Sequence, residues 1–202
     1  MTPYRILITT IFLHPGCAVD QRLRAEGWET IFKPLLGPRS EDELIDLLRG
    51  IDGGIFSGDP FTARVLEASP QLKVISRTGV GYDAIDLKAA TAQGIVVCNT
   101  PGVNRHAVAE WTFALILSCA RKMKENLSEV RNGGWVRHEG MDLAGKTLGI
   151  VGLGTIGKEV AQRANAFEMR ILACEVVRDV QFAEAHRVTF VPLERLLAES
   201  DF

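Results

Sequence analysis

Apolar and polar residues alternate with two different periods along the first hundred positions. Short apolar runs, typical of buried strands, occupy residues 5–11, 29–34, 53–58, 72–77 and 95–100. Segments with helical spacing lie between them, at residues 19–27, 41–50, 63–70 and 87–94. Strands that alternate with helices in this way form a parallel sheet with helices on both faces. The pattern therefore predicts an α/β domain.

Capping residues support the helices of this first region. Ser40 and Glu43 form a capping box at the start of 41–50. Thr62 and Asp86 stand where the N-caps of the next two helices belong, and Gly94 stands at a C-terminal cap position.

The pattern changes after Asn104, which is the expected N-cap of a long helix. Residues 106–120 are apolar on almost every side, so this helix must be buried on several sides, between domains or between subunits. A second alternation follows, with strands expected at 146–152, 170–176 and 188–192 and helices at 156–168, 183–186 and 193–200. We therefore expect two domains, residues 1–101 and 102–202.

Composition narrows the classes of partner. A net charge of -2 gives no basic surface for nucleic acid or for an anionic membrane, so we expect small molecules or other subunits as partners. The four cysteines are widely separated, which favours reduced thiols in the cytoplasm over a zinc site or disulfides. The apolar N-terminal segment is better explained by a first buried strand than by a secretory signal.

The sequence GLGTIG at residues 152–157 joins a predicted strand to a predicted helix. This is the context in which a G-x-G-x-x-G loop binds a dinucleotide. Gly152 allows the tight turn, Gly154 allows the backbone to approach a pyrophosphate, and Gly157 allows the helix to pack closely on the strand. The alternative is that the three glycines only shape a strand-to-helix turn.

An acidic residue at the end of the next strand strengthens the dinucleotide interpretation. Glu175 stands where a carboxylate accepts hydrogen bonds from both ribose hydroxyls of NAD and repels the 2′-phosphate of NADP. Arg178, three residues further on, is the feature that favours NADP instead. We expect NAD.

Two long segments carry a family resemblance. Residues 76–117 (SRTGVGYDAIDLKAATAQGIVVCNTPGVNRHAVAEWTFALIL) and 143–167 (LAGKTLGIVGLGTIGKEVAQRANAF) closely resemble NAD-dependent D-2-hydroxyacid dehydrogenases, especially the D-3-phosphoglycerate dehydrogenase branch. The resemblance implies a flavodoxin-like, parallel-sheet substrate domain followed by the first half of a Rossmann dinucleotide-binding domain. It also implies interconversion of a D-2-hydroxy acid and its 2-keto acid, and a homodimer formed through the helix at 104–122.

The resemblance also assigns roles to individual residues. The turn from Arg77 to Asp83, with Gly79, Val80 and Gly81, matches the loop whose backbone N–H groups bind the substrate carboxylate. The residue that matches Val80 also touches the nicotinamide. Thr155 and Ile156 match the positions over the pyrophosphate, and Glu175 matches the ribose acid, which is usually Asp. Arg77 has a second interpretation, as a strand-end residue paired with a nearby acid.

The family's catalytic arginine, glutamate and histidine are expected downstream of Phe202, so none is assigned to a residue here. We expect the 202 residues alone to be inactive. His106, beside Arg105 at a helix start, hints at a nearby anion. Phosphoglycerate enzymes often carry an arginine after the third strand, where this chain has Ser57, Gly58 and Asp59. Two alternatives remain, a non-catalytic NAD-binding or dimerising module and a formate dehydrogenase-like enzyme.

Overall fold

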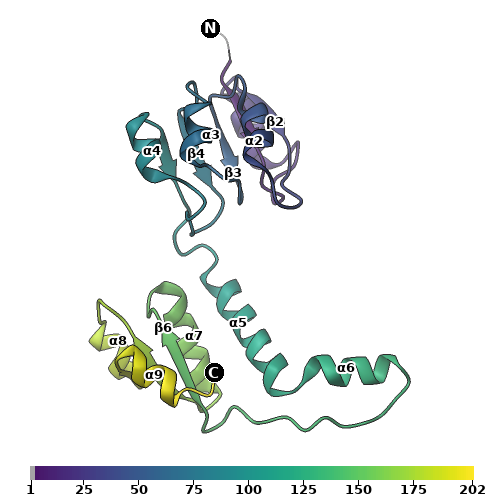
Figure 1. The fold of residues 1–202 in the computed structure, drawn as a ribbon, viewed down its shortest axis with the longest axis vertical. Helices are drawn as coiled ribbons and strands as arrows, with labels where there is room; N and C mark the ends of the chain where they lie inside the picture. Colours follow the sequence, from purple (N-terminus) through teal and green to yellow (C-terminus); the bar gives the residue numbers. More distant parts are fainter. Residues whose placement is uncertain (1–2) are drawn as a thin grey trace. The chain divides into compact units, whose positions relative to one another are not determined.

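The computed structural model describes residues 3–202, which form two compact units (Figure 1). Val103 ends the first unit and Asn104 begins the second, whereas the sequence places the boundary two residues earlier. Both units are built from parallel strands and helices, so the predicted α/β class is confirmed.

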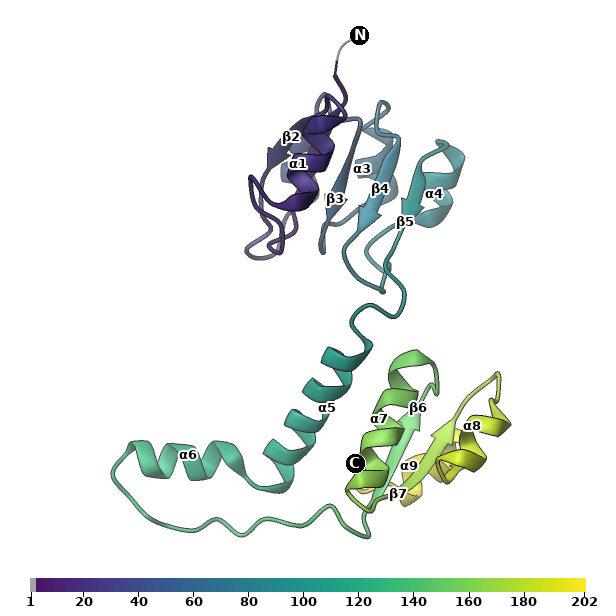
Figure 2. The ribbon, with the colours of Figure 1, turned by 180° about the vertical axis from the view of Figure 1, so that it is seen from behind.

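The first unit contains one five-stranded parallel sheet in the order β2-β1-β3-β4-β5. Helix α1 covers one face, and α2 and α3 lie side by side on the other (Figures 1 and 2). The elements are β1 (Arg5–Ile8), α1 (Ala18–Ala25), β2 (Glu29–Phe32), α2 (Glu41–Leu48), β3 (Gly53–Phe56), α3 (Ala63–Glu67), β4 (Val74–Arg77), α4 (Leu87–Ala92) and β5 (Val96–Cys98).

The predicted caps are present in this unit. The Ser40 hydroxyl accepts a bond from the Glu43 N–H, and the Glu43 carboxylate accepts one from the Ser40 N–H at 2.8 Å. Thr62 and Asp86 accept bonds from N–H groups in the first turns of α3 and α4. All of these helices are short, so their stability depends on packing on the sheet as well as on their caps.

The second unit has a three-stranded parallel sheet in the order β6-β7-β8. Side chains alternate along β7, so that Ile171 and Ala173 face α7 while Leu172 faces α9. The elements are α5 (Arg105–Ala120), α6 (Met123–Arg131), β6 (Thr147–Val151), α7 (Thr155–Ala166), β7 (Arg170–Cys174), α8 (Val180–Ala185), β8 (Val188–Phe190) and α9 (Leu193–Glu199).

Helix α5 packs on α7 but keeps an apolar surface exposed within the single chain. Ala109 and Phe113 are buried, whereas Trp111 and Leu115, one turn apart, are 66% and 51% exposed. In residues 3–202 no helix has the length and apolar character needed to cross a bilayer.

Helix α6 is absent from the sequence-based prediction. It starts after Lys122, which adopts a left-handed conformation (φ 46°) and turns the chain sharply after α5 (Figure 1). None of its residues is buried. Met123, Leu127 and Val130 recur at helical spacing but are exposed, and this short stripe is the signal that the prediction did not use.

Strand β6 lies at the edge of its sheet, but part of its outer side is hydrogen-bonded to another segment. Phe202 donates its N–H to the carbonyl of Thr147 (3.2 Å) and accepts a bond from the Gly149 N–H (2.9 Å). This is the bonding pattern of a parallel pair. The first half of this edge is therefore paired by the last residues of the chain.

Candidate functional site

The glycine loop connects β6 to α7 as predicted. Gly152 has a φ of +91°, a conformation that side chains rarely tolerate, and its N–H donates to the carbonyl of Cys174 (2.9 Å). Helix α7 begins at Thr155 with Gly154 as N-cap. Because glycine has no side chain to cap the helix, the N–H groups of the first turn face outward without that partner.

Two glycines of the loop differ in what a side chain would meet. A Cβ at Gly157 would lie 2.3 Å from the carbonyl oxygen of Gly152, so glycine is needed there for the helix to approach the strand. A Cβ at Gly154 would have no atom within 4 Å, and its φ of -74° is ordinary for any residue. The fold therefore requires glycine at 157 but not at 154.

Glu175 follows directly after β7 and turns its carboxylate toward the glycine loop. One oxygen accepts a bond from the Val176 N–H (2.7 Å), and the other accepts a bond from the Leu153 N–H (2.6 Å). These backbone donors, Val176 first and then Leu153, hold the pKa of Glu175 below its usual range. Glu175 is therefore an anion at neutral pH, fixed beside the loop.

A pocket of about 690 Å³ brings three of the predicted cofactor residues together. Gly154 and Thr155 of the loop and Glu175 line it, but Ile156 turns inward and packs against the apolar core of the unit. The remaining lining residues come from α5, from one face of α7 and from the segment leading into α8: Arg105, Leu153, Lys158, Glu159, Gln162, Val177, Arg178, Asp179 and Phe182.

The basic side chains at the start of α5 have a partner within the protein. His106 Nδ1 lies 3.1 Å from one carboxylate oxygen of Glu159, and Arg105 Nε lies 3.3 Å from the other. Arg163 also contacts this carboxylate at 2.7 Å and is the main cause of the lowered pKa of Glu159. The anion that the Arg105–His106 pair suggested is thus, in part, Glu159, a residue that the sequence did not single out.

In the first unit, the turn after β4 is held by its carbonyl groups. The carbonyl of Gly79 accepts a bond from the Thr100 N–H (3.0 Å), and that of Val80 accepts one from the Asn99 side chain (2.9 Å). The carbonyl of Gly81 accepts a bond from Arg77 Nε (2.8 Å). With three successive carbonyls held, the direction of the intervening N–H groups is fixed, as an anion-binding turn requires.

Arg77 and Asn99 have their side chains committed to this turn. Besides Gly81, the Arg77 guanidinium donates to the carbonyl of Ser57, so it joins the ends of β3 and β4. Among residues 3–202, the bonds of the Arg77 side chain go to backbone carbonyls, and no ion pair with a nearby acid is present. Asn99 was missed by the sequence analysis, although its place at the end of β5, beside β4 in the sheet, is the signal that points to it.

Asp59 forms a buried polar cluster at the carboxyl ends of β1 and β3. Its carboxylate accepts bonds from the Thr9 hydroxyl (2.5 Å) and the Ser57 N–H (3.2 Å) and forms an ion pair with Arg39. Its side chain has no exposed surface. The cluster fixes the same β3 end, at Ser57, that Arg77 contacts.

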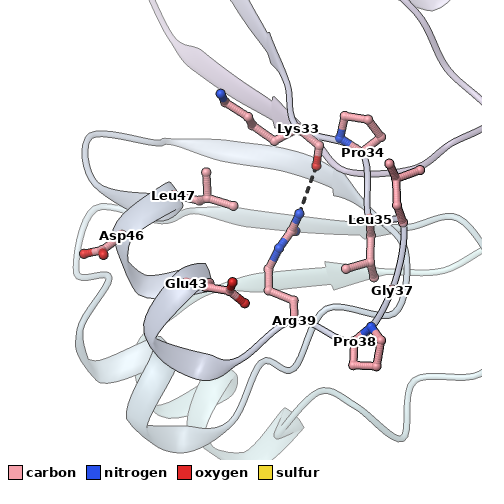
Figure 3. Close-up of a pocket in the computed structure, with 10 residues that line it drawn as sticks. Lys33, Pro34, Leu35, Gly37, Pro38, Arg39, Glu43, Asp46 and Leu47 are labelled. Atoms are coloured by element: carbon pink, nitrogen blue, oxygen red, sulfur yellow. Dashed lines mark hydrogen bonds between the residues drawn. The ribbon is translucent and has the colours of Figure 1, made fainter.

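Arg39 also borders a separate pocket of about 640 Å³ between the β2–α2 loop and α2 (Figure 3). Its guanidinium donates to the carbonyl of Lys33 (3.1 Å), drawn as the dashed line in Figure 3. The Arg39 guanidinium is therefore already engaged by Asp59 and a backbone carbonyl. The other charged residues of the pocket are Lys33, Glu43 and Asp46.

Comparisons with known proteins place the chain in a family. Residues 10–189 match the model of the D-isomer specific 2-hydroxyacid dehydrogenase catalytic domain. Among curated proteins, glyoxylate reductase of Korarchaeum cryptofilum is 43% identical over 172 residues, covering 82% of this chain and 52% of the relative. D-3-phosphoglycerate dehydrogenase of Archaeoglobus fulgidus is 45% identical over 141 residues, covering 69% of this chain and 27% of the relative.

Solved structures agree with this placement. A protein from Thermus thermophilus matches with a TM-score of 0.83 and 38% identity, over 98% of this chain and 62% of the other. D-lactate dehydrogenase from Aquifex aeolicus, in complex with NAD and lactic acid, matches with a TM-score of 0.80 and 28% identity (97% and 58% covered). An acyclic imino acid reductase in complex with NADPH and D-Arg matches with a TM-score of 0.80 and 27% identity (98% and 63% covered).

The chain spans about half the length, or less, of these two curated relatives. Of these two neighbours with bound cofactor, one holds NAD and the other NADPH. The family model covers most of the 202 residues, and its match includes both the turn at residues 77–83 and the glycine loop. This chain therefore belongs to the family of D-isomer specific 2-hydroxyacid dehydrogenases.

Proposed function

We propose that the chain supplies the substrate-binding unit and the first part of the cofactor-binding unit of an NAD-dependent dehydrogenase that interconverts a D-2-hydroxy acid and its 2-keto acid. The observation that supports this proposal best is the open space around Gly154. Nothing in the protein requires a glycine there, because a Cβ would meet no atom within 4 Å. A ligand that approaches the backbone at the start of α7 does require it.

The residues present fit a dinucleotide. Gly154 and Thr155 would face the pyrophosphate with backbone N–H groups, after the tight turn that Gly152 allows, and Glu175 would accept bonds from the ribose hydroxyls. Ile156 would contribute its backbone, since its side chain packs in the core. The bound nicotinamide would supply hydride chemistry. The charge of Glu175, which stays ionised, favours NAD over NADP because it repels a 2′-phosphate.

The turn at Gly79, Val80 and Gly81 would bind the substrate carboxylate through its backbone N–H groups. Arg77 supports this role indirectly, because its guanidinium holds the turn from the inside. Val80 would also border the nicotinamide.

We infer that the substrate carries no phosphate. The position where phosphoglycerate enzymes often have an arginine is occupied by Ser57, Gly58 and the buried Asp59. The neighbouring cation, Arg39, is bound to Asp59 and is therefore unavailable. A short, unphosphorylated hydroxy acid, of the kind that a glyoxylate reductase acts on, fits these residues better than D-3-phosphoglycerate.

We further propose that the 202 residues bind the cofactor without turnover, and that they dimerise through α5. The family's arginine, glutamate and histidine have no assigned counterpart in this chain. The exposed Trp111 and Leu115 on α5 support a second subunit as the partner of that helix.

Calorimetry with NADH tests the central claim. We expect the 202-residue protein to bind NADH and Gly154→Ala to lose at least tenfold in affinity, because the added methyl group stands where the phosphate approaches, an effect of about 1.4 kcal/mol or more. The thermal midpoint of Gly154→Ala checks that the variant is folded. Unchanged NADH binding by a folded Gly154→Ala protein, or no heat with the parent protein, would refute the proposal.

A further inference from the structure

Lys158 and Asp179 form an ion pair on the wall of the nucleotide pocket. Lys158 lies on the first turn of α7, directly after Gly157, and its Nζ is 2.5 Å from Oδ2 of Asp179. Asp179 is the N-cap of α8 and follows Arg178 in the loop that starts at Glu175. Each of these charged residues lines the same pocket of about 690 Å³.

Two aromatic rings hold the cations of this wall in place. Lys158 Nζ lies 5.1 Å from the centre of the Phe182 ring, and the guanidinium carbon of Arg178 lies 5.4 Å from the centre of the Phe190 ring. These contacts keep both cations beside the pocket without consuming their hydrogen-bonding capacity. The Asp179 carboxylate is the group that occupies the Lys158 ammonium.

The negative charge of Asp179 exceeds what its structural role requires. As N-cap of α8, its Oδ1 accepts a bond from the Phe182 N–H (3.0 Å). Asparagine and serine serve equally well as N-caps, so an uncharged residue would hold α8 just as well. The charge has a second consequence, which is to neutralise Lys158.

We infer that Asp179 is a positioning residue for cofactor choice, because it withholds Lys158 from the 2′-phosphate of NADP. This inference rests on the proposed function, in which Glu175 binds the adenosine ribose. With Asp179 ionised, the charge of Lys158 is neutralised. Without the charge of Asp179, Lys158 and Arg178 together form a site for a phosphate next to the ribose position.

The test measures dissociation constants for NADH and NADPH by calorimetry on the full 202-residue chain and on Asp179→Asn, which keeps the N-cap. We expect NADPH affinity to rise about fivefold or more, while NADH affinity changes less than about twofold. Lys158→Met in the Asp179→Asn background should abolish the gain. Asp179→Ser provides a second uncharged cap, and thermal midpoints verify that each variant is folded.

Asp142→Asn is the matched control. Asp142 pairs with Arg121 at 2.8 Å in the same unit but does not line the nucleotide pocket, so this variant makes the same change in net charge elsewhere. The inference is wrong if NADH binds the parent protein but Asp179→Asn shifts the two affinities equally or not at all. It is also wrong if the gain persists after Lys158→Met or appears in Asp142→Asn. If neither cofactor binds the parent protein, the proposed function itself fails.

Discussion

The backbone N–H of Leu153 donates a 2.6 Å hydrogen bond to the carboxylate of Glu175. This bond joins the glycine loop after β6 to the acid after β7, so the group expected at the pyrophosphate and the group expected at the ribose are held together before any ligand arrives. A site that is ordered in advance loses less conformational entropy when it binds.

Glu175→Gln separates the charge of this residue from its geometry. The glutamine oxygen can still accept the Leu153 N–H, but it binds the ribose hydroxyls as a neutral group. We expect NADH to bind about tenfold more weakly, because hydrogen bonds to a charged acceptor are worth about 1.5–3 kcal/mol. Glu199→Gln, which removes a carboxylate paired with Arg170 and Arg195, should leave the affinity unchanged.

NADH binding should also be insensitive to mild acid. Backbone donors lower the pKa of Glu175, so the carboxylate stays ionised as the pH falls through the ordinary glutamate value of about 4.3. Its contribution to folding and to binding is therefore present above that value and is lost only below it. The informative range is about pH 6 to pH 5, which lies above the ordinary glutamate pKa. A loss of NADH affinity in this range that is absent in Glu175→Gln would contradict the prediction.

Gly157→Ala should destabilise the second unit. The new methyl group would lie 2.3 Å from the Gly152 carbonyl oxygen, and relieving that clash moves α7 away from β6. We expect a loss of about 1–3 kcal/mol in urea unfolding, the usual cost of overpacking. Gly154→Ala is the control, with an expected change below about 1 kcal/mol. Equal effects of the two substitutions would show that the close approach of α7 is not what Gly157 provides.

Arg77→Met should loosen the turn at residues 78–83 without unfolding the first unit. The substitution removes the bonds to the carbonyls of Ser57 and Gly81. Amide hydrogen exchange in residues 78–83 should become about 10- to 100-fold faster. Arg64→Met, which removes an exposed ion-paired arginine on α3, should leave these rates as they are. Protection that survives Arg77→Met would assign the turn's order to Asn99 and Thr100 alone.

The Asp59–Arg39 pair should be the most sensitive ionic contact in the first unit. Asp59→Asn leaves Arg39 with little exposed surface and no counter-charge, a change that costs about 3–5 kcal/mol in buried pairs. Adding Arg39→Gln should recover part of the loss in urea unfolding. Asp46→Asn, which breaks an exposed pair with Arg49, should cost less than about 1 kcal/mol. A loss no larger than that control would show that the pair is not a stabilising contact.

The proposed dimer predicts that charge on the exposed face of α5 is disruptive. Trp111→Glu and Leu115→Glu should each weaken dimerisation by about thirtyfold or more in sedimentation equilibrium, as expected for central interface residues. Leu36→Glu, at an even more exposed leucine of the first unit, should have no effect. A parent protein that sediments as a monomer at all concentrations would exclude the dimer.

Local signals account for what the sequence predicted correctly. The caps at Ser40, Thr62 and Asp86 act within four residues, and both parallel sheets follow from apolar runs separated by helices. The glycine loop and Glu175 are likewise readable, because their spacing relative to a strand and a helix is diagnostic.

Contacts between residues that are distant in the sequence could not be predicted from the sequence. Arg39 and Asp59 meet only because the loop after β2 passes the end of β3, and Asn99 reaches Val80 only because β5 lies beside β4. Lys158 and Asp179 belong to different helices, so their pairing has no periodic signature. Helix α6 was missed for a different reason, because its apolar stripe of Met123, Leu127 and Val130 is short and lies in an otherwise polar segment.

The pairing of Phe202 with β6 shortens the part of that sheet margin on which another strand could add. The bonds already engage the carbonyl of Thr147 and the N–H of Gly149, so they leave only the second half of the strand to a newcomer. A segment that used the whole length of β6 would first have to displace Phe202. This protection comes from backbone bonds and therefore does not depend on the identity of any side chain.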